Sequence, residues 1–238
     1  MMETNYFEQV IESIAQADKV LVGIGNEMDI TFPSEIADYF DAQKSLECAK
    51  WLHAQEHILQ DDCYQKLNEM LKDKDYYIIS LCTDDGIFRV FPKDAPIVTP
   101  CGGLSMLQCK KKCAGQLYPV DLNANQVPVC NECGETLIFN NIYADEYYDE
   151  NGYLDKFADY KKWLQTTINK NLCILELGVG MRFPTVIRFA FDKLAYYNQK
   201  CHFYRVHETL FQHTAENCER GISIKQNAKE FLQSKSRD

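Results

Sequence analysis

The stretch from Val98 to Cys133 decides how this chain is organised. It holds two short cysteine pairs, one with three residues between the thiols and one with two, separated by sixteen residues. Such spacing lets the thiolates of both pairs converge on one ion while the backbone turns tightly. The predicted ligands are Cys109, Cys113, Cys130 and Cys133. Four sulfur ligands favour a structural zinc ion, and the alternatives are two disulfides or four unrelated thiols.

The composition is that of a globular protein. The chain has 238 residues, of which 46% are hydrophobic and 25% charged, enough for one large core with a small inserted domain. It contains no run of about eighteen apolar residues, so we expect no membrane partner. The N-terminal residues lack the basic and apolar parts of an export signal, so we expect free thiols in a reducing, cytoplasmic location.

The charge argues against nucleic acid as a partner. The formal net charge is −10, and binding to a phosphate backbone depends on lysine and arginine. The one basic cluster, Lys110–Lys112, lies inside the first cysteine pair. It either touches a phosphate or is solvated, and its position favours the solvated interpretation.

Apolar runs alternate with helical patterns along the rest of the chain. We expect buried strands at 19–23, 76–82, 172–177 and 201–207. We expect helices over about 5–17, in three pieces over 34–72 with Pro33 and Ser34 as the start signal, over 156–169, from Pro184 onward, and over 224–232. This alternation predicts an α/β fold, a parallel Rossmann-like sheet with helices on both faces.

Small or polar residues follow each expected strand. These clusters are 23–27, 81–86, 178–182 and 207–209. The carboxyl ends of parallel strands share one edge of a sheet, so the clusters should converge there, where ligands of open α/β sheets bind. Glycines at such ends let phosphates approach the backbone. The acidic, tyrosine-rich segment 143–155 is either a solvated loop, which we favour, or a surface for a cationic partner.

The order of these parts resembles the sirtuins, and most closely their macrodomain-associated bacterial branch. The matching motifs are Gly23-Ile-Gly25, Leu81-Cys-Thr-Asp-Asp85-Gly, Cys101-Gly102 placed eight residues before the first zinc cysteine, Glu176-Leu-Gly-Val-Gly-Met-Arg-Phe-Pro184, and Tyr204-Arg-Val-His207. The resemblance covers about residues 5–235.

The resemblance implies a Rossmann-like NAD domain formed by 1–97 and 140–238, with a helical insertion at about 34–72, and a zinc-ribbon small domain at 98–139. It implies structural Zn²⁺, NAD or ADP-ribose as cofactor, a protein substrate or partner, and chemistry at the nicotinamide–ribose bond, either ADP-ribosyl transfer or lysine deacylation. The implied cofactor-binding residues are Gly23, Gly25, Asn26, Thr83, Asp85, Gly178, Gly180, Met181 and His207, and the implied catalytic positions are Cys101 and Asp85.

Several positions depart from the family pattern. Cys101 replaces the histidine base, which argues against deacetylation and leaves ADP-ribosyl transfer open. Ile24 replaces a small alanine, and we expect its side chain to intrude on the path of NAD. Glu27 replaces a serine, and a carboxylate facing a pyrophosphate costs affinity. Thr83 and His207 each replace an asparagine.

Cys101 has three interpretations. It is a nucleophile or redox-sensitive thiol, a metal ligand together with His207 or Asp85, or a small residue left after function was lost; lone cysteines favour the last. Two functions follow: a divergent NAD-dependent transferase or deacylase, or a catalytically impaired nucleotide-binding or protein-interaction module. The fold alone does not choose between them.

Overall fold

The computed structural model describes residues 5–113 and 115–234 and has two β-sheets. The large sheet has six parallel strands in the order β3-β2-β1-β7-β8-β9. They are β1 (Lys19–Ile24), β2 (Tyr76–Ser80), β3 (Ile97–Val98), β7 (Leu172–Leu177), β8 (Cys201–Val206) and β9 (Gly221–Ile224). The small antiparallel sheet consists of β4 (Gly102–Cys109), β5 (Leu117–Pro119) and β6 (Leu137–Asn141).

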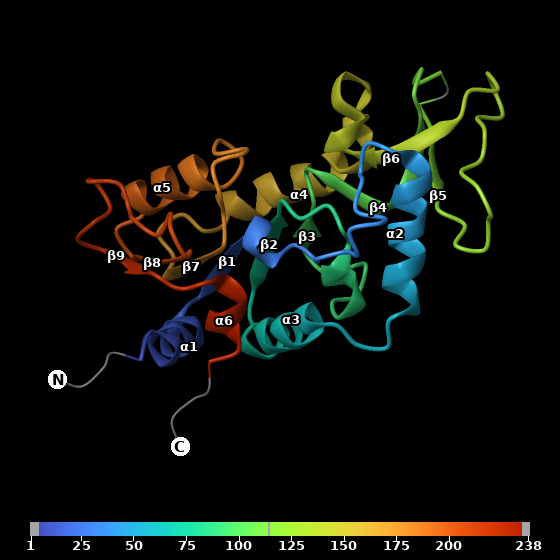
Figure 1. Ribbon diagram of the computed structural model, residues 1–238. Helices are drawn as coiled ribbons and strands as arrows, with labels where there is room; N and C mark the ends of the chain where they lie inside the picture. Colours follow the sequence, from blue (N-terminus) through green and yellow to red (C-terminus); the bar gives the residue numbers. More distant parts are fainter. Residues whose placement is uncertain (1–4, 114, 235–238) are drawn as a thin grey trace.

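Helices cover both faces of the large sheet (Figure 1). On one face lie α4 (Leu154–Gln165) and α5 (Arg188–Tyr197), and on the other lie α1 (Tyr6–Gln16), α3 (Leu59–Met70) and α6 (Ala228–Leu232). The predicted class, a parallel α/β sheet with helices on both faces, is confirmed. The four expected strands are all present, because each is a continuous apolar run of the kind that a sheet covered on both faces requires.

The side chains of β1 show how the two faces are divided. Val20, Val22 and Ile24 point into the core beneath α1, α3 and α6, and Leu21 points into the core beneath α5. Ile24 is 0% exposed in the first of these cores. The expectation that Ile24 intrudes on the ligand path was therefore wrong, because the alternation of the strand turns it toward the helices.

The segment 34–72 holds two α-helices rather than three. The first, α2 (Ala42–Ala54), begins after Asp41, whose carboxylate accepts a hydrogen bond from the backbone N–H of Lys44 at 2.9 Å. Turns precede it, so Pro33 and Ser34 do not start a helix. The helix α2 packs on the small sheet, where Leu46, Leu52 and Leu107 share a core.

The structure corrects three further boundaries. The helix expected from Pro184 begins only at Arg188, after a series of turns. The closing helix expected over 224–232 begins at Ala228, because Gly221–Ile224 forms the edge strand β9 instead. Val98 lies in β3 and pairs with β2, although the sequence placed it in the cysteine-rich segment. Both missed strands are short edge strands, which give little periodic signal.

Candidate functional site

The carboxyl ends of the central strands meet at one edge of the large sheet, as expected. Backbone hydrogen bonds join the ends of neighbouring strands: Leu81 N–H donates to Ile24 O at 2.9 Å, and Gly25 N–H donates to Leu177 O at 2.9 Å. Gly178 N–H donates to Val206 O at 2.8 Å. The four clusters thus lie along one edge, and the chain direction of the crossovers reverses between β1 and β7, the position where open α/β sheets bind ligands.

Two glycines, one inside β1 and one directly after it, make room for different parts of the protein. A β-carbon at Gly23 would lie 2.6 Å from Cγ2 of Ile187, so this glycine makes room for α5 to pack on the sheet. A β-carbon at Gly25 would lie 2.3 Å from Cα of Val179, so this glycine lets the loop after β7 cross directly over the end of β1. Both therefore allow close packing of the protein on itself, at and beneath the candidate site.

Glu27 occupies the crevice between the ends of β1, β7 and β8. Its carboxylate accepts hydrogen bonds from the backbone N–H of Glu208 at 2.9 Å and of Ala228 at 3.0 Å. Its Cβ is so close to Gly178, which has a φ of +63°, that a β-carbon there would lie 2.4 Å away. The backbone amides at this point are thus already paired with an anionic group of the chain itself.

His207, at the end of β8, faces the same carboxylate. Its Nδ1 lies 2.9 Å from Glu27 Oε1 and 3.1 Å from the backbone nitrogens of Thr209 and Leu210. Burial lowers the pKa of His207, and the charge of Glu27 raises it. This nitrogen donates to Glu27 when it carries a proton, and accepts from the two amides when it does not.

A small cavity of about 30 Å³ lies beside this crevice. Among its lining residues are three of the predicted cofactor-binding positions, Asn26, Thr83 and Gly180. Met181 does not line it and is 50% exposed on the surface. Asn26 Oδ1 is so close to Gly180 that a β-carbon there would lie 2.7 Å away, so the loops after β1 and β7 form two adjoining walls.

Aromatic rings and one arginine cover this cavity. Tyr143 stacks on Tyr39 with ring centroids 4.8 Å apart. Arg182 places its guanidinium 4.9 Å from the centre of the Tyr143 ring and donates a hydrogen bond to the Tyr143 hydroxyl at 3.1 Å. The segment 143–155 was interpreted as a solvated loop, but the structure packs its first residue over the site. Arg182 brings the positive charge that an anionic ligand needs.

Asp85 connects the two sheets. Its Oδ2 accepts a hydrogen bond from the backbone N–H of Leu104 at 2.7 Å. A β-carbon at Gly103 would lie 2.0 Å from Asp85 Oδ1, so the start of β4 can approach this carboxylate only without a side chain. Burial raises the pKa of Asp85, and hydrogen bonds from Ser105 and Leu104 lower it. Asp85 thus holds the small sheet and also lines a larger hollow of about 500 Å³.

Cys101 lies buried at the start of β4, with 3% of its surface exposed. Burial raises its pKa to about 12, and the nearby Arg182 lowers it only in part. At neutral pH this group is a protonated thiol, the opposite of the state that a nucleophile needs. Among the described residues, Cys101 belongs to no group of three or more potential metal ligands.

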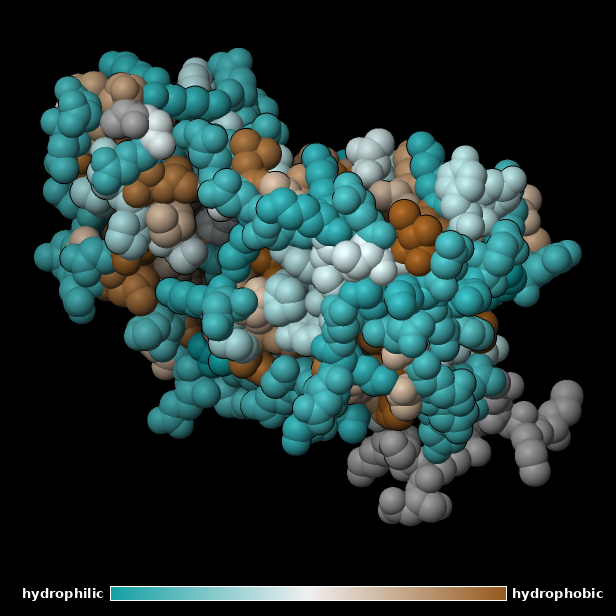
Figure 2. Space-filling view, turned by 180° about the vertical axis from the view of Figure 1, so that it is seen from behind, coloured by the Kyte–Doolittle hydropathy of each residue, from teal (hydrophilic) through white to brown (hydrophobic). Residues whose placement is uncertain are grey.

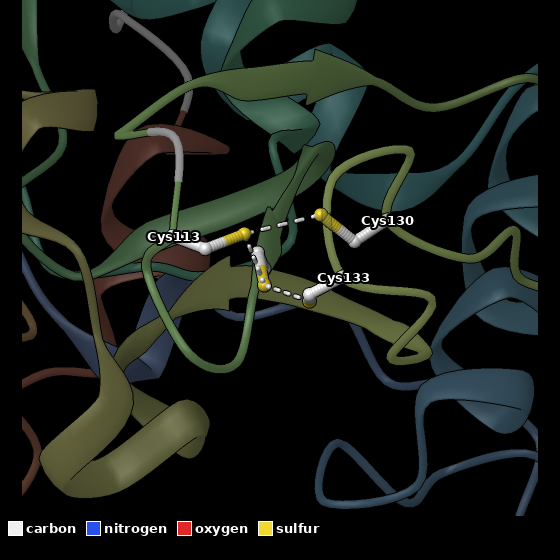
Figure 3. Close-up of side chains that lie close together, drawn as sticks. Cys113, Cys130 and Cys133 are labelled. Carbon is white, nitrogen blue, oxygen red and sulfur yellow. Dashed lines mark hydrogen bonds between the residues drawn. The ribbon is translucent and has the colours of Figure 1, made fainter.

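The predicted cysteine tetrad comes together at the far end of the small sheet (Figure 3). Cys113 Sγ lies 3.4 Å from the sulfurs of Cys109 and Cys130, and Cys109 Sγ lies 3.5 Å from that of Cys133. Tetrahedral thiolates at Zn–S distances of about 2.3 Å stand about 3.8 Å apart, so the set fits a zinc ion. Backbone N–H groups of Glu132 and Cys133 lower the pKa of Cys130, whereas hydrogen bonds to the neighbouring thiols raise that of Cys113.

The sequence did not single out Asp29 and Asp84, although both lie at the site. Asp84 is 1% exposed, and burial raises its pKa to about 7, against hydrogen bonds from the amides of Ile30 and Gly86 that lower it. Asp29 lines the small cavity. Asp84 was within the expected cluster 81–86, but strand alternation beyond Ser80 does not predict which of two neighbouring aspartates points inward.

Within residues 5–113 and 115–234, no helix has both the length and the apolar character needed to cross a membrane. Seen from behind, the cysteine-rich part projects as a lobe beside the main body (Figure 2). The face shown there is mostly hydrophilic, with hydrophobic residues in small groups rather than in one broad patch.

The sequence comparisons find one curated relative and no matching family model. No family model matches any part of the chain. A protein of Fusarium oxysporum f. sp. cubense, described as a probable bifunctional ADP-ribose hydrolase/ADP-ribosyltransferase, is 29% identical in an alignment 132 residues long that covers 46% of this chain and 22% of that protein. The chain therefore spans about a fifth of the length of this curated relative.

Solved structures agree over almost the whole chain. A Sir2 homologue in complex with NAD matches with a TM-score of 0.60 at 13% identity, covering 98% of this chain and 91% of that one. The structure of Sir2Af2 bound to a myristoylated histone peptide matches with a TM-score of 0.57 at 12% identity, covering 95% and 93% of the two chains. At these identities the agreement establishes the shared fold.

Proposed function

We propose that this chain, which has the sirtuin fold, binds NAD or ADP-ribose at the carboxyl edge of its large sheet and acts at the nicotinamide–ribose bond. Of the two reactions open to such a site, transfer of ADP-ribose to a protein is favoured over lysine deacylation. The observation that carries the proposal is the fold itself, which agrees with a Sir2–NAD complex along 98% of the chain. The curated relative, described as a probable bifunctional ADP-ribose hydrolase/ADP-ribosyltransferase, supports the choice of reaction through the second of these activities.

The state of Cys101 is the reason for favouring transfer. Deacylation in the family relies on a histidine base at this position, and the thiol here has a pKa of about 12 because it is buried. It therefore neither accepts a proton as readily as imidazole nor attacks as a thiolate near neutral pH. Burial raises the pKa of Asp84, at the same edge, to about 7, close to the pH at which a group that transfers protons works best.

The remaining residues would position the ligand. Asn26, Thr83 and Gly180 line the cavity from three strand ends, and the guanidinium of Arg182 borders it. These groups offer one amide, one hydroxyl, one backbone segment and one positive charge, a set suited to a ribose and its attached phosphates. The cysteine tetrad would hold a structural zinc ion that fixes the small sheet, and through Asp85 the start of β4, against the site.

The site in its present conformation does not fit an entire NAD molecule. The cavity measures about 30 Å³, and Glu27 takes the two backbone amides at the crevice between β1, β7 and β8. A dinucleotide would have to displace this carboxylate, whose side chain has three rotatable bonds. Binding of NAD at this place therefore requires movement of the Glu27 side chain.

Titration calorimetry with NAD and ADP-ribose tests the proposal. Binding of either ligand, weakened by Arg182→Ala, is expected, because this change removes the positive charge beside the cavity while leaving the fold in place. Arg220→Ala, far from the site on the loop before β9, is the matched control. No heat with either ligand at millimolar concentration would contradict the proposal.

A second candidate function is a nucleotide-binding or protein-interaction module that has lost catalysis, and the internal pairing of Glu27 favours it. Release of nicotinamide from NAD in the presence of candidate protein substrates separates the two candidates. Turnover supports the transferase, and binding without turnover supports the module. Cys101→Ala is expected to leave any turnover unchanged, because a buried protonated thiol supplies no chemistry.

A further inference from the structure

A short strap, residues 142–148, follows β6 and borders the small cavity. Its two ends are tied to the two residues that precede β4. Ile142 N–H donates to Cys101 O at 3.0 Å, and the Tyr148 hydroxyl donates to Pro100 O at 2.9 Å. The strap therefore leaves and rejoins the protein at one place, and the residues between its ends are the part that is able to move.

The small sheet and the first cysteine pair fasten the C-terminal end of the strap. Gln108, on β4 and 1% exposed, donates from Nε2 to Tyr147 O at 2.6 Å. Lys112 Nζ donates to Tyr148 O at 2.8 Å, and Lys110 Nζ lies 4.9 Å from the centre of the Tyr147 ring. Two lysines of the basic cluster thus contact the strap, so this end moves with the lobe that carries the cysteine tetrad.

The middle of the strap is strained at Asp145. Its backbone has a φ of 52° and a ψ of −128°, a combination that glycine adopts in tight turns and that raises the free energy of other residues. Such a conformation persists only where the contacts on either side hold it. Breaking those contacts would release the strain, and this favours an open arrangement of the strap.

Tyr143 makes the contacts that hold the strap closed. Its ring stacks on Tyr39 and meets the edge of Phe40, with centroids 4.8 Å and 5.3 Å away, and its hydroxyl accepts a hydrogen bond from Arg182 at 3.1 Å. Phe40 and Arg182 are exposed, and Tyr143 is half-buried. Water competes with contacts at such a surface, so each of them is weak and the strap is able to open.

The closed strap limits the space and the charge that a ligand could use. The cavity beneath it measures about 30 Å³, whereas sites for small molecules measure roughly 300 Å³ or more. Ile142 and Tyr143 line the cavity, so movement of the Tyr143 ring would enlarge it. The same movement would free the guanidinium of Arg182, which the Tyr143 hydroxyl now engages, for an anionic group.

We propose that residues 142–148 form a strap that closes the small cavity, with the contact between Tyr143 and Arg182 as its lock, and that breaking this lock exposes Arg182 to an anionic ligand. The ends of the strap stay fastened at Cys101 and Gln108, so the small sheet does not have to move. The inference rests on the proposed function only for the identity of the ligand. Opening and closing require no ligand, so the first test uses the protein alone.

Hydrogen exchange, followed by mass spectrometry of peptides that cover 142–148, is this first test. Tyr143→Ala and Arg182→Ala should each make these amides exchange about tenfold faster, because both changes remove the lock. Peptides of β7 should exchange as in the wild type, which shows that the variants are folded. Tyr197→Ala, which changes a tyrosine on α5 that is 78% exposed, is the matched control. Unchanged exchange of 142–148 in both variants would overturn the proposal.

Calorimetry with ADP-ribose then separates the two roles of Arg182. Tyr143→Ala should bind about tenfold more tightly than the wild type, because the strap no longer competes for the guanidinium. Arg182→Ala should bind more weakly, because it opens the strap but also removes the charge. Affinity of Tyr143→Ala at or below that of the wild type would overturn the strap as a barrier to the ligand. If no protein bound ADP-ribose while 142–148 exchanged faster in the variants, the proposed function would be wrong and closure of the cavity by the strap would remain supported.

Discussion

Glu27 Oε1 lies 2.9 Å from Nδ1 of His207, and the same carboxylate accepts the backbone N–H groups of Glu208 and Ala228. A negatively charged side chain thus accepts one backbone donor from the residues that follow β8 and one from the first turn of α6. Backbone amides grouped in this way are a common means of binding phosphate. The protein therefore supplies its own anion at the crevice, and any anionic ligand has to compete with it.

The first prediction concerns this competition. Glu27→Ser should raise the affinity for ADP-ribose by about tenfold, because it frees two amides and removes a like charge from the crevice. Calorimetry measures the effect. Glu27→Gln is the control, since it removes the charge but keeps an acceptor of the same size. Equal affinity in wild type and Glu27→Ser would mean that the ligand does not bind at this crevice.

The second prediction concerns pH and His213. This ring packs edge-on against Phe203 with centroids 4.5 Å apart, and burial, followed by the charge of Arg205, lowers its pKa from 6.5 to about 4. The unfolded chain then binds a proton that the folded chain does not, so the free energy of unfolding should fall as pH drops from about 6.5 to about 4.

Denaturant unfolding across this pH range, compared between wild type and His213→Phe, isolates the effect. The stability difference between the two proteins should shift in favour of the variant as pH falls. His202→Asn, which changes an exposed histidine on β8, should follow the wild type. A pH-independent difference between wild type and His213→Phe would contradict the assignment.

The third prediction separates two kinds of glycine. Gly25→Ala should lower the free energy of unfolding by about 3 kcal/mol or more, because the new β-carbon would lie 2.3 Å from Cα of Val179. Gly115→Ala should cost about 1 kcal/mol: its φ is +55°, but nothing lies within 4 Å of the added atom. If both variants lost the same free energy of unfolding, the loop after β7 would be able to move away from the added methyl group.

The fourth prediction concerns the cysteine tetrad. Cys130→Ser should remove the zinc held there and lower the melting temperature by about 10 °C or more, because the metal is what joins the two cysteine pairs. Cys218→Ser, an exposed thiol elsewhere, is the control and should behave as the wild type. If Cys130→Ser melted like the wild type, the four thiols would not be holding a structural ion.

Some of these features were predictable from sequence because their signals are local. Cys109 and Cys133 belong to pairs whose spacing alone limits the geometry, and the apolar runs of β1 and β7 can only be buried strands. The convergence of the strand ends follows from parallel topology. The sequence also indicated a negative charge at this edge, because Glu27 stands in a glycine-rich strand turn; whether it faces a bound ligand stays a prediction.

Other features depend on contacts between distant segments. Gly23 looked like a glycine for a ligand, but the space it leaves is filled by Ile187, a residue more than a hundred and sixty positions away. No pattern within β1 distinguishes a glycine that makes room for a ligand from one that makes room for a packed side chain. Ile30 and Asp84 likewise meet only because the segment after β1 packs against the end of β2, 54 positions further along the chain. The edge strand β9 is four residues long, too short to show a period.

The contact between Asp85 and the start of β4 has a consequence for how this protein can vary. The Asp85 carboxylate bonds the backbone at the start of β4, and Gly103 allows this close approach because it has no side chain. Growth of a methyl group at that one position would push the cysteine-bearing lobe outward as a unit. Gly103 is therefore a position where the packing between the two sheets tolerates no added side chain without movement.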